Sequence, residues 1–165
     1  MPVKQWSCKD LVWSALILVL VVVGLIAFGR SSAQAAAVNC GDTITTDTTL
    51  HQDLVDCPNN GIIIGADNVT LDLNSHLVDG DGTEFAGCDP NAAICDSGVV
   101  NDGHDGVTVM HGRVREFGVG VLLGTTTPGR VRHNRLLDIS SSKNLSFGFE
   151  VASTARSVVR ESSGS

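Results

Sequence analysis

The stretch that decides the fold is GIIIGADNVTLDLNSHLVDG, residues 61–80. A short apolar run follows its first glycine, and a polar turn then leads into an alternation in which Val69, Leu71 and Leu73 are separated by polar residues. Alternation with a period of two predicts a strand that is buried on one face. Two short strands joined by a turn, within about twenty residues, are typical of one unit of a repeat protein.

The same order of features recurs downstream, in residues 98–112, 118–134 and 148–162. In each copy a glycine and a few apolar residues lead through a polar turn to a second apolar run. We interpret Leu71, Val109, Val131 and Val159 as equivalent positions, and the 22 residues from Val109 to Val131 as the length of one repeat. The longer steps then contain additional loops, at residues 81–97 and 140–145.

A repeat of this size cannot bury its own apolar face. Successive repeats therefore stack, pair their strands in parallel about 4.8 Å apart, and share one continuous core. The sequence predicts an all-β fold, namely a parallel β-helix with a single chain and roughly four or five rungs. An antiparallel sandwich with irregular hairpins is the alternative, and the consistent spacing of the repeats favours the β-helix.

Four stretches resemble secreted right-handed parallel β-helix repeat proteins, which are pectate-lyase-like and have NosD-type and alginate-epimerase-type relatives. The resemblance extends from about residue 39 to the C-terminus and implies a right-handed β-helix. It leaves the activity open, because this architecture hosts lyases, hydrolases, epimerases and adhesins. The epimerase pattern Asp-Pro-His followed by an acid is missing at residues 89–92, which argues against a complete epimerase site. The stretches are CGDTITTDTTLHQDLVDC, GADNVTLDLNSH, NDGHDGVTVMHGRVREFGVGVLL and RVRHNRL.

The N-terminal segment has the features of an export signal. Lys4 and Lys9 precede an apolar run at residues 11–28, and small residues follow at 35–37. This order predicts a helical signal peptide over residues 1–37 and a secreted repeat domain over residues 38–165. The apolar run approaches the length that spans a membrane, so an uncleaved anchor is the alternative and the one form of membrane association that we expect.

Export would place the remaining cysteines in an oxidising compartment, where an even number indicates disulfides. Pairing of Cys40 with Cys57 and of Cys88 with Cys95 is the simplest of three connectivities. A zinc site is the alternative, but the chain lacks the C-x-x-C spacing typical of such sites.

The predicted domain is short for a β-helix, and its last repeat stops at Ser165 without a capping segment. A strand edge left open in this way would face solvent, which proteins normally avoid. We therefore expect either a C-terminally incomplete solenoid or self-association through its open end.

Charge is segregated along the chain. Residues 36–112 contain thirteen Asp and Glu and no Lys or Arg, whereas residues 113–165 contain eight Lys and Arg and four acids. A basic half favours anionic ligands, and the overall charge of −7 argues against nucleic acid. In the predicted register Arg113 is equivalent to Arg135, and Arg132 to Arg160. We expect these four side chains to bind an acidic polysaccharide or another anionic cell-envelope polymer.

The same residues are candidates for catalysis. β-Elimination from a uronic acid requires neutralisation of its carboxylate and a base, which Arg113, Arg132 and Arg135 could supply together with His133 or His111. Outward charges that serve only solubility are the alternative. His111 and His133 share a position in the predicted register, and alternation predicts that both point inward. The sequence thus leaves open a lyase, epimerase or glycosidase, a non-enzymatic adhesion module, and an inactive fragment.

Acidic turns give a second candidate site. Asp79, Asp81, Asp102 and Asp105 lie in glycine-containing loops, and clustered carboxylates suit Ca²⁺. Ordinary turn chemistry is the alternative reading of Asp-Gly pairs. We therefore expect that the protein requires no cofactor and that Ca²⁺ is the one candidate for a bound ion. The chain has no tyrosine, and its two tryptophans lie in the leader, so aromatic platforms for neutral sugars are scarce.

Overall fold

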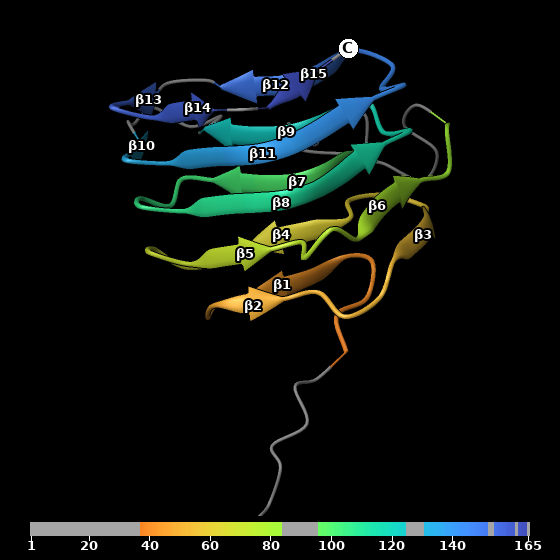
Figure 1. The fold of residues 1–165 in the computed structure, drawn as a ribbon, viewed down its shortest axis with the longest axis horizontal. Coiled ribbons are helices and arrows are strands. Elements are labelled where there is room, and N and C mark those ends of the chain that lie inside the picture. Colours follow the sequence, from red (N-terminus) through yellow and green to blue (C-terminus); the bar gives the residue numbers. More distant parts are fainter. Residues whose placement is uncertain (1–36, 84–95, 125–130, 152–153, 161, 165) are drawn as a thin grey trace, which may run out of the picture. The chain divides into compact units, whose positions relative to one another are not determined.

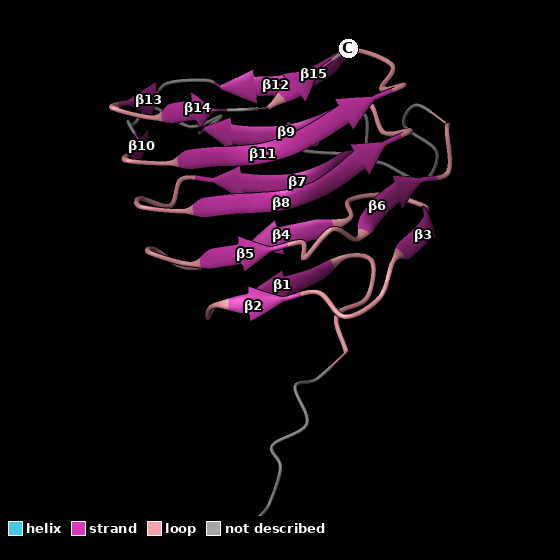
Figure 2. Cartoon of the chain, in the orientation of Figure 1, coloured by secondary structure: helices cyan, strands magenta, loops and turns pink. Residues whose placement is uncertain are grey.

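The computed structural model describes residues 37–83, 96–124, 131–151, 154–160 and 162–164, which belong to one compact unit spanning residues 37–165. Regular secondary structure in these segments is entirely β-strand (Figures 1 and 2). The predicted all-β class is therefore confirmed. The predicted signal helix and the Cys88–Cys95 pair lie outside the described residues.

In the part of the chain that the structure describes, no helix is long and apolar enough to cross a membrane.

The strands form two main sheets and one small sheet (Figure 1). Strands that neighbour each other within a main sheet come from successive passages of the chain. Sheet A consists, in order, of β1 (Asp42–Ile44), β4 (Ile62–Ile64), β7 (Ser97–Asp102), β9 (Val119–Gly124) and β12 (Phe147–Val151). Sheet B consists, in order, of β14 (Val158–Arg160), β11 (Arg135–Ser142), β8 (Thr108–Arg115), β5 (Thr70–Asp72) and β2 (Thr48–Thr49). In addition, β6 (Leu77–Gly80) pairs with β3 (Leu54–Cys57) and with β8, β15 (Ser163–Gly164) pairs with β11, and β10 (Val131–Arg132) pairs with β13 (Thr154–Ala155).

Every strand pair among the described residues is parallel. The chain passes from a strand of sheet A to strands of sheet B and back, so that each passage lies beside the previous one. Five such passages follow from the five strands of sheet A. We call them repeats 1 to 5, and they begin at β1, β4, β7, β9 and β12. An antiparallel sandwich is excluded.

Inward side chains from successive repeats form columns in one apolar core shared by both sheets. In sheet B, Leu71 pairs with Val109, Val109 with Leu136, and Leu136 with Val159. The predicted equivalence of Leu71, Val109 and Val159 is thus confirmed, but Val131 is not part of this column. Val131 lies in β10 and pairs with Thr154 instead.

The error at Val131 comes from the length of the repeat. Val109 pairs with Leu136, 27 residues later, whereas the sequence predicts one repeat in the 22 residues from Val109 to Val131. His133, between Val131 and Leu136, has a φ of +60°, and the residues level with it in the neighbouring repeats, Gly106 and Arg156, also have positive φ. The turn at His133 is therefore shared by these repeats.

A column of glycines runs through sheet A, one residue before each inward apolar position. It contains Gly61, Gly98, Gly120 and Gly148, because the residues that follow them are aligned by the strand pairing. A Cβ on Gly98 would come within 2.7 Å of the carbonyl oxygen of Gly120 and would also overlap the side chain of Val114. Close approach of neighbouring repeats at this corner requires glycine.

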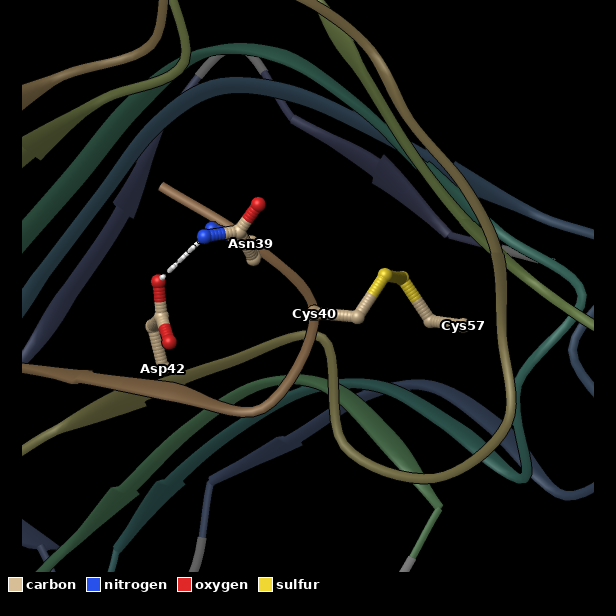
Figure 3. Close-up of a disulfide and its surroundings, with 4 residues drawn as sticks. All are labelled: Asn39, Cys40, Asp42 and Cys57. Atoms are coloured by element: carbon tan, nitrogen blue, oxygen red, sulfur yellow. Dashed lines mark hydrogen bonds between the residues drawn. A yellow bond between two sulfur atoms is a disulfide. The ribbon is translucent and has the colours of Figure 1, made fainter. Parts of the chain in front are cut away.

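The predicted disulfide between Cys40 and Cys57 is confirmed (Figure 3). It ties the chain before β1 to the end of β3, within repeat 1. Beside it, the main-chain N–H of Asn39 donates to Oδ2 of Asp42 at 2.7 Å. Val38 and Cys40 pack against the core, so the segment before β1 contributes to it.

Candidate anion-binding site

Three of the predicted ligand-binding arginines lie close together in repeats 4 and 5. Arg132 ends β10, Arg135 begins β11, and Arg160 lies in β14, where it pairs with Leu137. Arg135 and Arg160 are therefore on neighbouring strands and two positions apart, which separates their Cα atoms by about 8 Å. All three side chains are exposed. We call Arg132, Arg135 and Arg160 the arginine cluster.

The turn between Arg132 and Arg135 is held in place by Asn134, which is buried. Its Oδ1 accepts a hydrogen bond from the N–H of Val107 at 2.9 Å, and its Nδ2 donates to the carbonyl of His104 at 3.2 Å. The N–H of Arg135 in turn donates to the carbonyl of Val107 at 2.8 Å. A buried amide whose oxygen and nitrogen are both hydrogen-bonded fixes the backbone of this turn. The side chains of Arg132 and Arg135 therefore extend from a fixed backbone.

A further cation, Arg156, was missed by the sequence analysis. The pairing of the neighbouring residues places it opposite His133, and both residues have positive φ, +57° and +60°. Both side chains are exposed. The sequence did carry a signal that the two residues are equivalent, because each precedes a polar residue and then a new strand. The incorrect register in the sequence analysis hid this equivalence.

Arg113 is not part of the arginine cluster, and the predicted pairing of Arg113 with Arg135 is wrong. Arg113 pairs with Ser140, whereas Arg135 pairs with Thr108, five positions earlier in β8. At about 3.3 Å per residue this distance along the strand is roughly 16 Å. The predicted pairing of Arg132 with Arg160 is also wrong in register, since Arg132 pairs with Ala155, although the two residues do belong to neighbouring repeats.

Arg113 lies instead beside an acidic group. Oδ1 of Asp53 accepts hydrogen bonds from the N–H of Leu77 at 3.0 Å and from Nδ1 of His76 at 2.9 Å. The Leu77 N–H, then His76 and, more weakly, the charge of Arg113 hold the pKa of the Asp53 carboxyl below its ordinary value of 3.8. Arg113 itself forms no ion pair among the described residues.

Two further Asp–His pairs connect repeats 2 and 3. Nδ1 of His104 lies 3.3 Å from Oδ1 of Asp67, and Nδ1 of His111 lies 3.2 Å from Oδ1 of Asp72. His111 has a φ of +57° and its side chain is exposed, so the prediction that it points inward is wrong. His133 is exposed for the same reason.

The candidate calcium residues are occupied by other contacts. Asp79 is buried and accepts two hydrogen bonds from Arg115, at 2.8 and 2.9 Å, which raise the pKa of that guanidinium. Oδ1 of Asp81 accepts from the hydroxyl of Thr83 at 2.7 Å and from its N–H at 2.9 Å, and these bonds lower the pKa of Asp81.

On a separate turn, Asp102 ends β7, and Oδ1 of Asp105 accepts from the N–H of Arg132 at 2.7 Å. Across the described segments, no group of three or more His, Cys, Asp or Glu residues is arranged to hold a metal ion.

Comparisons with protein-family models, with curated proteins and with solved structures found no match to this chain.

Proposed function

We propose that the protein is a secreted, right-handed parallel β-helix that binds an acidic polysaccharide through the arginine cluster of repeats 4 and 5. Parallel pairing of every described strand and the columns of inward apolar residues support the β-helix. The cluster of exposed guanidinium groups on neighbouring repeats supports the ligand class.

The observation that carries the proposal is which arginines form ion pairs within the protein and which do not. Within the described residues, no ion pair involves Arg132, Arg135 or Arg160, which lie together on neighbouring repeats, whereas Arg115 is paired with Asp79 and Arg113 stands apart from the cluster. A planar guanidinium is matched to a carboxylate, with which it forms two parallel hydrogen bonds. Arginines on stacked repeats can engage successive uronate residues of one extended polymer.

The ligand is expected to be charged rather than neutral. Neutral sugars are usually held against the faces of tryptophan or tyrosine rings, and residues 37–165 contain neither. Recognition then depends on the carboxylates of the polymer. Binding of this kind weakens as the salt concentration rises, because exposed charges are screened.

The test compares two sets of arginine substitutions in a titration with polygalacturonate at low salt. We expect the triple variant Arg132→Ala, Arg135→Ala, Arg160→Ala to bind about 30-fold more weakly than the unchanged protein. The reason is that each exposed charge pair contributes at most about 1 kcal/mol, so that three contribute about 2 kcal/mol.

Arg113→Ala is the matched control and should bind normally, and dextran, a neutral polymer, should not bind. Full binding by the triple variant, or an equal loss in Arg113→Ala, would contradict the proposal. The absorbance of unsaturated uronate in the same mixtures separates the two forms of the proposal. Its increase indicates a lyase that uses His133 between Arg132 and Arg135, and a constant signal during binding indicates a binding module.

A further inference from the structure

A column of left-handed residues lies at the turn that leads from sheet A into sheet B. It contains one residue from each of repeats 2 to 5, namely Asn68, Gly106, His133 and Arg156, with φ values of +59°, +70°, +60° and +57°. Residues that are level in neighbouring strands lie about 4.8 Å apart. His133 is therefore flanked by Gly106 in repeat 3 and by Arg156 in repeat 5.

The surroundings of His133 are basic toward repeat 5. His133 and Arg156 are both exposed, and no ion pair among the described residues involves either of them. Arg132 precedes His133 in the chain, and Arg135 follows it by two residues. On the other side Gly106 contributes no side chain. An anion that contacts His133 therefore also meets guanidinium groups.

The nearest described carboxylates lie toward repeats 2 and 3. Asp105 is level with Arg132, and its Oδ1 accepts a hydrogen bond from the N–H of Arg132 at 2.7 Å. Oδ1 of Asp67, one repeat further away, accepts from the N–H of Asp105 at 3.0 Å and lies 3.3 Å from Nδ1 of His104. Both carboxylates thus accept hydrogen bonds within the protein, and neither is on the repeat 5 side of His133.

We propose that His133 and Arg156 form a further anion subsite beside the arginine cluster, and that the charge on His133 makes the acidic polymer bind more tightly in mildly acidic solution. This inference rests on the proposed function. Histidine is the side chain whose charge ordinarily changes between about pH 5 and about pH 8, whereas guanidinium groups stay positive throughout. The carboxylates of the polymer stay ionised over the same range. Among the described groups of the site, His133 is then the one whose charge changes.

The subsite continues the arginine cluster along the strands. Arg135 follows His133 by two residues, a separation of about 7 Å between Cα atoms, and Arg160 lies further along the neighbouring strand. Two carboxylates of one extended polymer can therefore contact the subsite and the cluster together. Protonation of His133 adds one positive charge to this band without moving the backbone, which is fixed by the buried amide of Asn134.

Titration with polygalacturonate at low salt, at about pH 5.5 and about pH 8, tests the role of His133. The unchanged protein should bind about five-fold more tightly at the lower pH, the factor expected for one exposed charge pair. His133→Gln should bind equally at both pH values. The matched control is His51→Gln, because His51 is exposed and lies in repeat 1, and this variant should keep the five-fold difference.

Arg156→Ala tests the other half of the subsite. It should weaken binding about five-fold at both pH values, since a guanidinium is charged at both, whereas Arg113→Ala should not. A pH difference that persists in His133→Gln, equal affinity of the unchanged protein at both pH values, or normal binding by Arg156→Ala would overturn this inference alone. Absence of binding by the unchanged protein at both pH values would overturn the proposed function and this inference with it.

Discussion

Repeats 1 to 3 and repeats 4 and 5 use the same backbone arrangement but treat charge differently. In the first three, carboxylates are bonded within the stack, to histidines or main-chain N–H groups of the following repeat. In the last two, the exposed arginines make no ion pair among the described residues. Carboxylates of the early repeats thus contribute to cohesion between repeats, whereas Arg132, Arg135 and Arg160 of the late repeats make no such ion pair.

One column shows where this change occurs. Oδ1 of Asp67 accepts from the N–H of Asp105 at 3.0 Å, and Oδ1 of Asp105 accepts from the N–H of Arg132 at 2.7 Å. Each carboxylate therefore accepts a main-chain hydrogen bond from the next repeat. Arg132 occupies the third position of the column, and its guanidinium has no acceptor with which to continue the series. The last of these hydrogen bonds from the backbone to a carboxylate is donated by Arg132, the first residue of the arginine cluster.

The largest expected effect is a difference in stability between a substitution inside a core column and one at the end of the same column. Leu136→Ala should lower the free energy of unfolding by about 3 kcal/mol, because Leu136 is fully buried and a cavity remains. Val159→Ala, in the same column of repeat 5, should cost less than about 1 kcal/mol. Urea unfolding measures both values. Equal losses would contradict the difference in burial between Leu136 and Val159.

A somewhat smaller effect is expected at the opposite end. Replacing Cys40 and Cys57 together by serine opens a loop with a sequence separation of 17 residues. The loss of this constraint on the unfolded chain should cost about 3 kcal/mol or slightly less. Unfolding in urea, compared with unchanged protein kept oxidised, gives the value. A variant as stable as the parent would show that the segment before β1 covers the core without the disulfide.

The smallest expected effect concerns pH. Because the folded pKa of Asp53 is lowered, its contribution to stability is fully present above the ordinary value of 3.8 and is lost as the pH falls through the folded value. Asp53→Asn should therefore flatten the acid side of the stability profile, measured as the urea midpoint between about pH 5 and about pH 2.

Asp56→Asn is the control for this change. Asp56 lies nearby in β3 with a φ of +54°, which asparagine tolerates. If Asp53→Asn and Asp56→Asn alter the profile equally, the hydrogen bonds of Asp53 to Leu77 and His76 are not the cause.

Much of the fold could be predicted from local pattern. Alternation over Val69, Leu71 and Leu73 predicted a strand buried on one face, glycine marked the start of repeats 2, 3 and 5, and two cysteines indicated a disulfide. The site was predicted less well. Arg132, Arg135 and Arg160 do lie on neighbouring repeats, although neither predicted pairing among the arginines holds, Arg113 lies elsewhere, and Arg156 was not singled out.

The sequence by itself determined which segments form strands, because alternation and turn residues act within a few neighbouring positions. It also determined the separation of acidic from basic repeats, which follows from the order of residues alone. Only the tertiary structure decided the register, since pairing between repeats joins residues more than twenty positions apart and the repeats differ in length, so that Val109 pairs with Leu136 and not with Val131. The register in turn decides which arginines are neighbours, and so where an anion can bind.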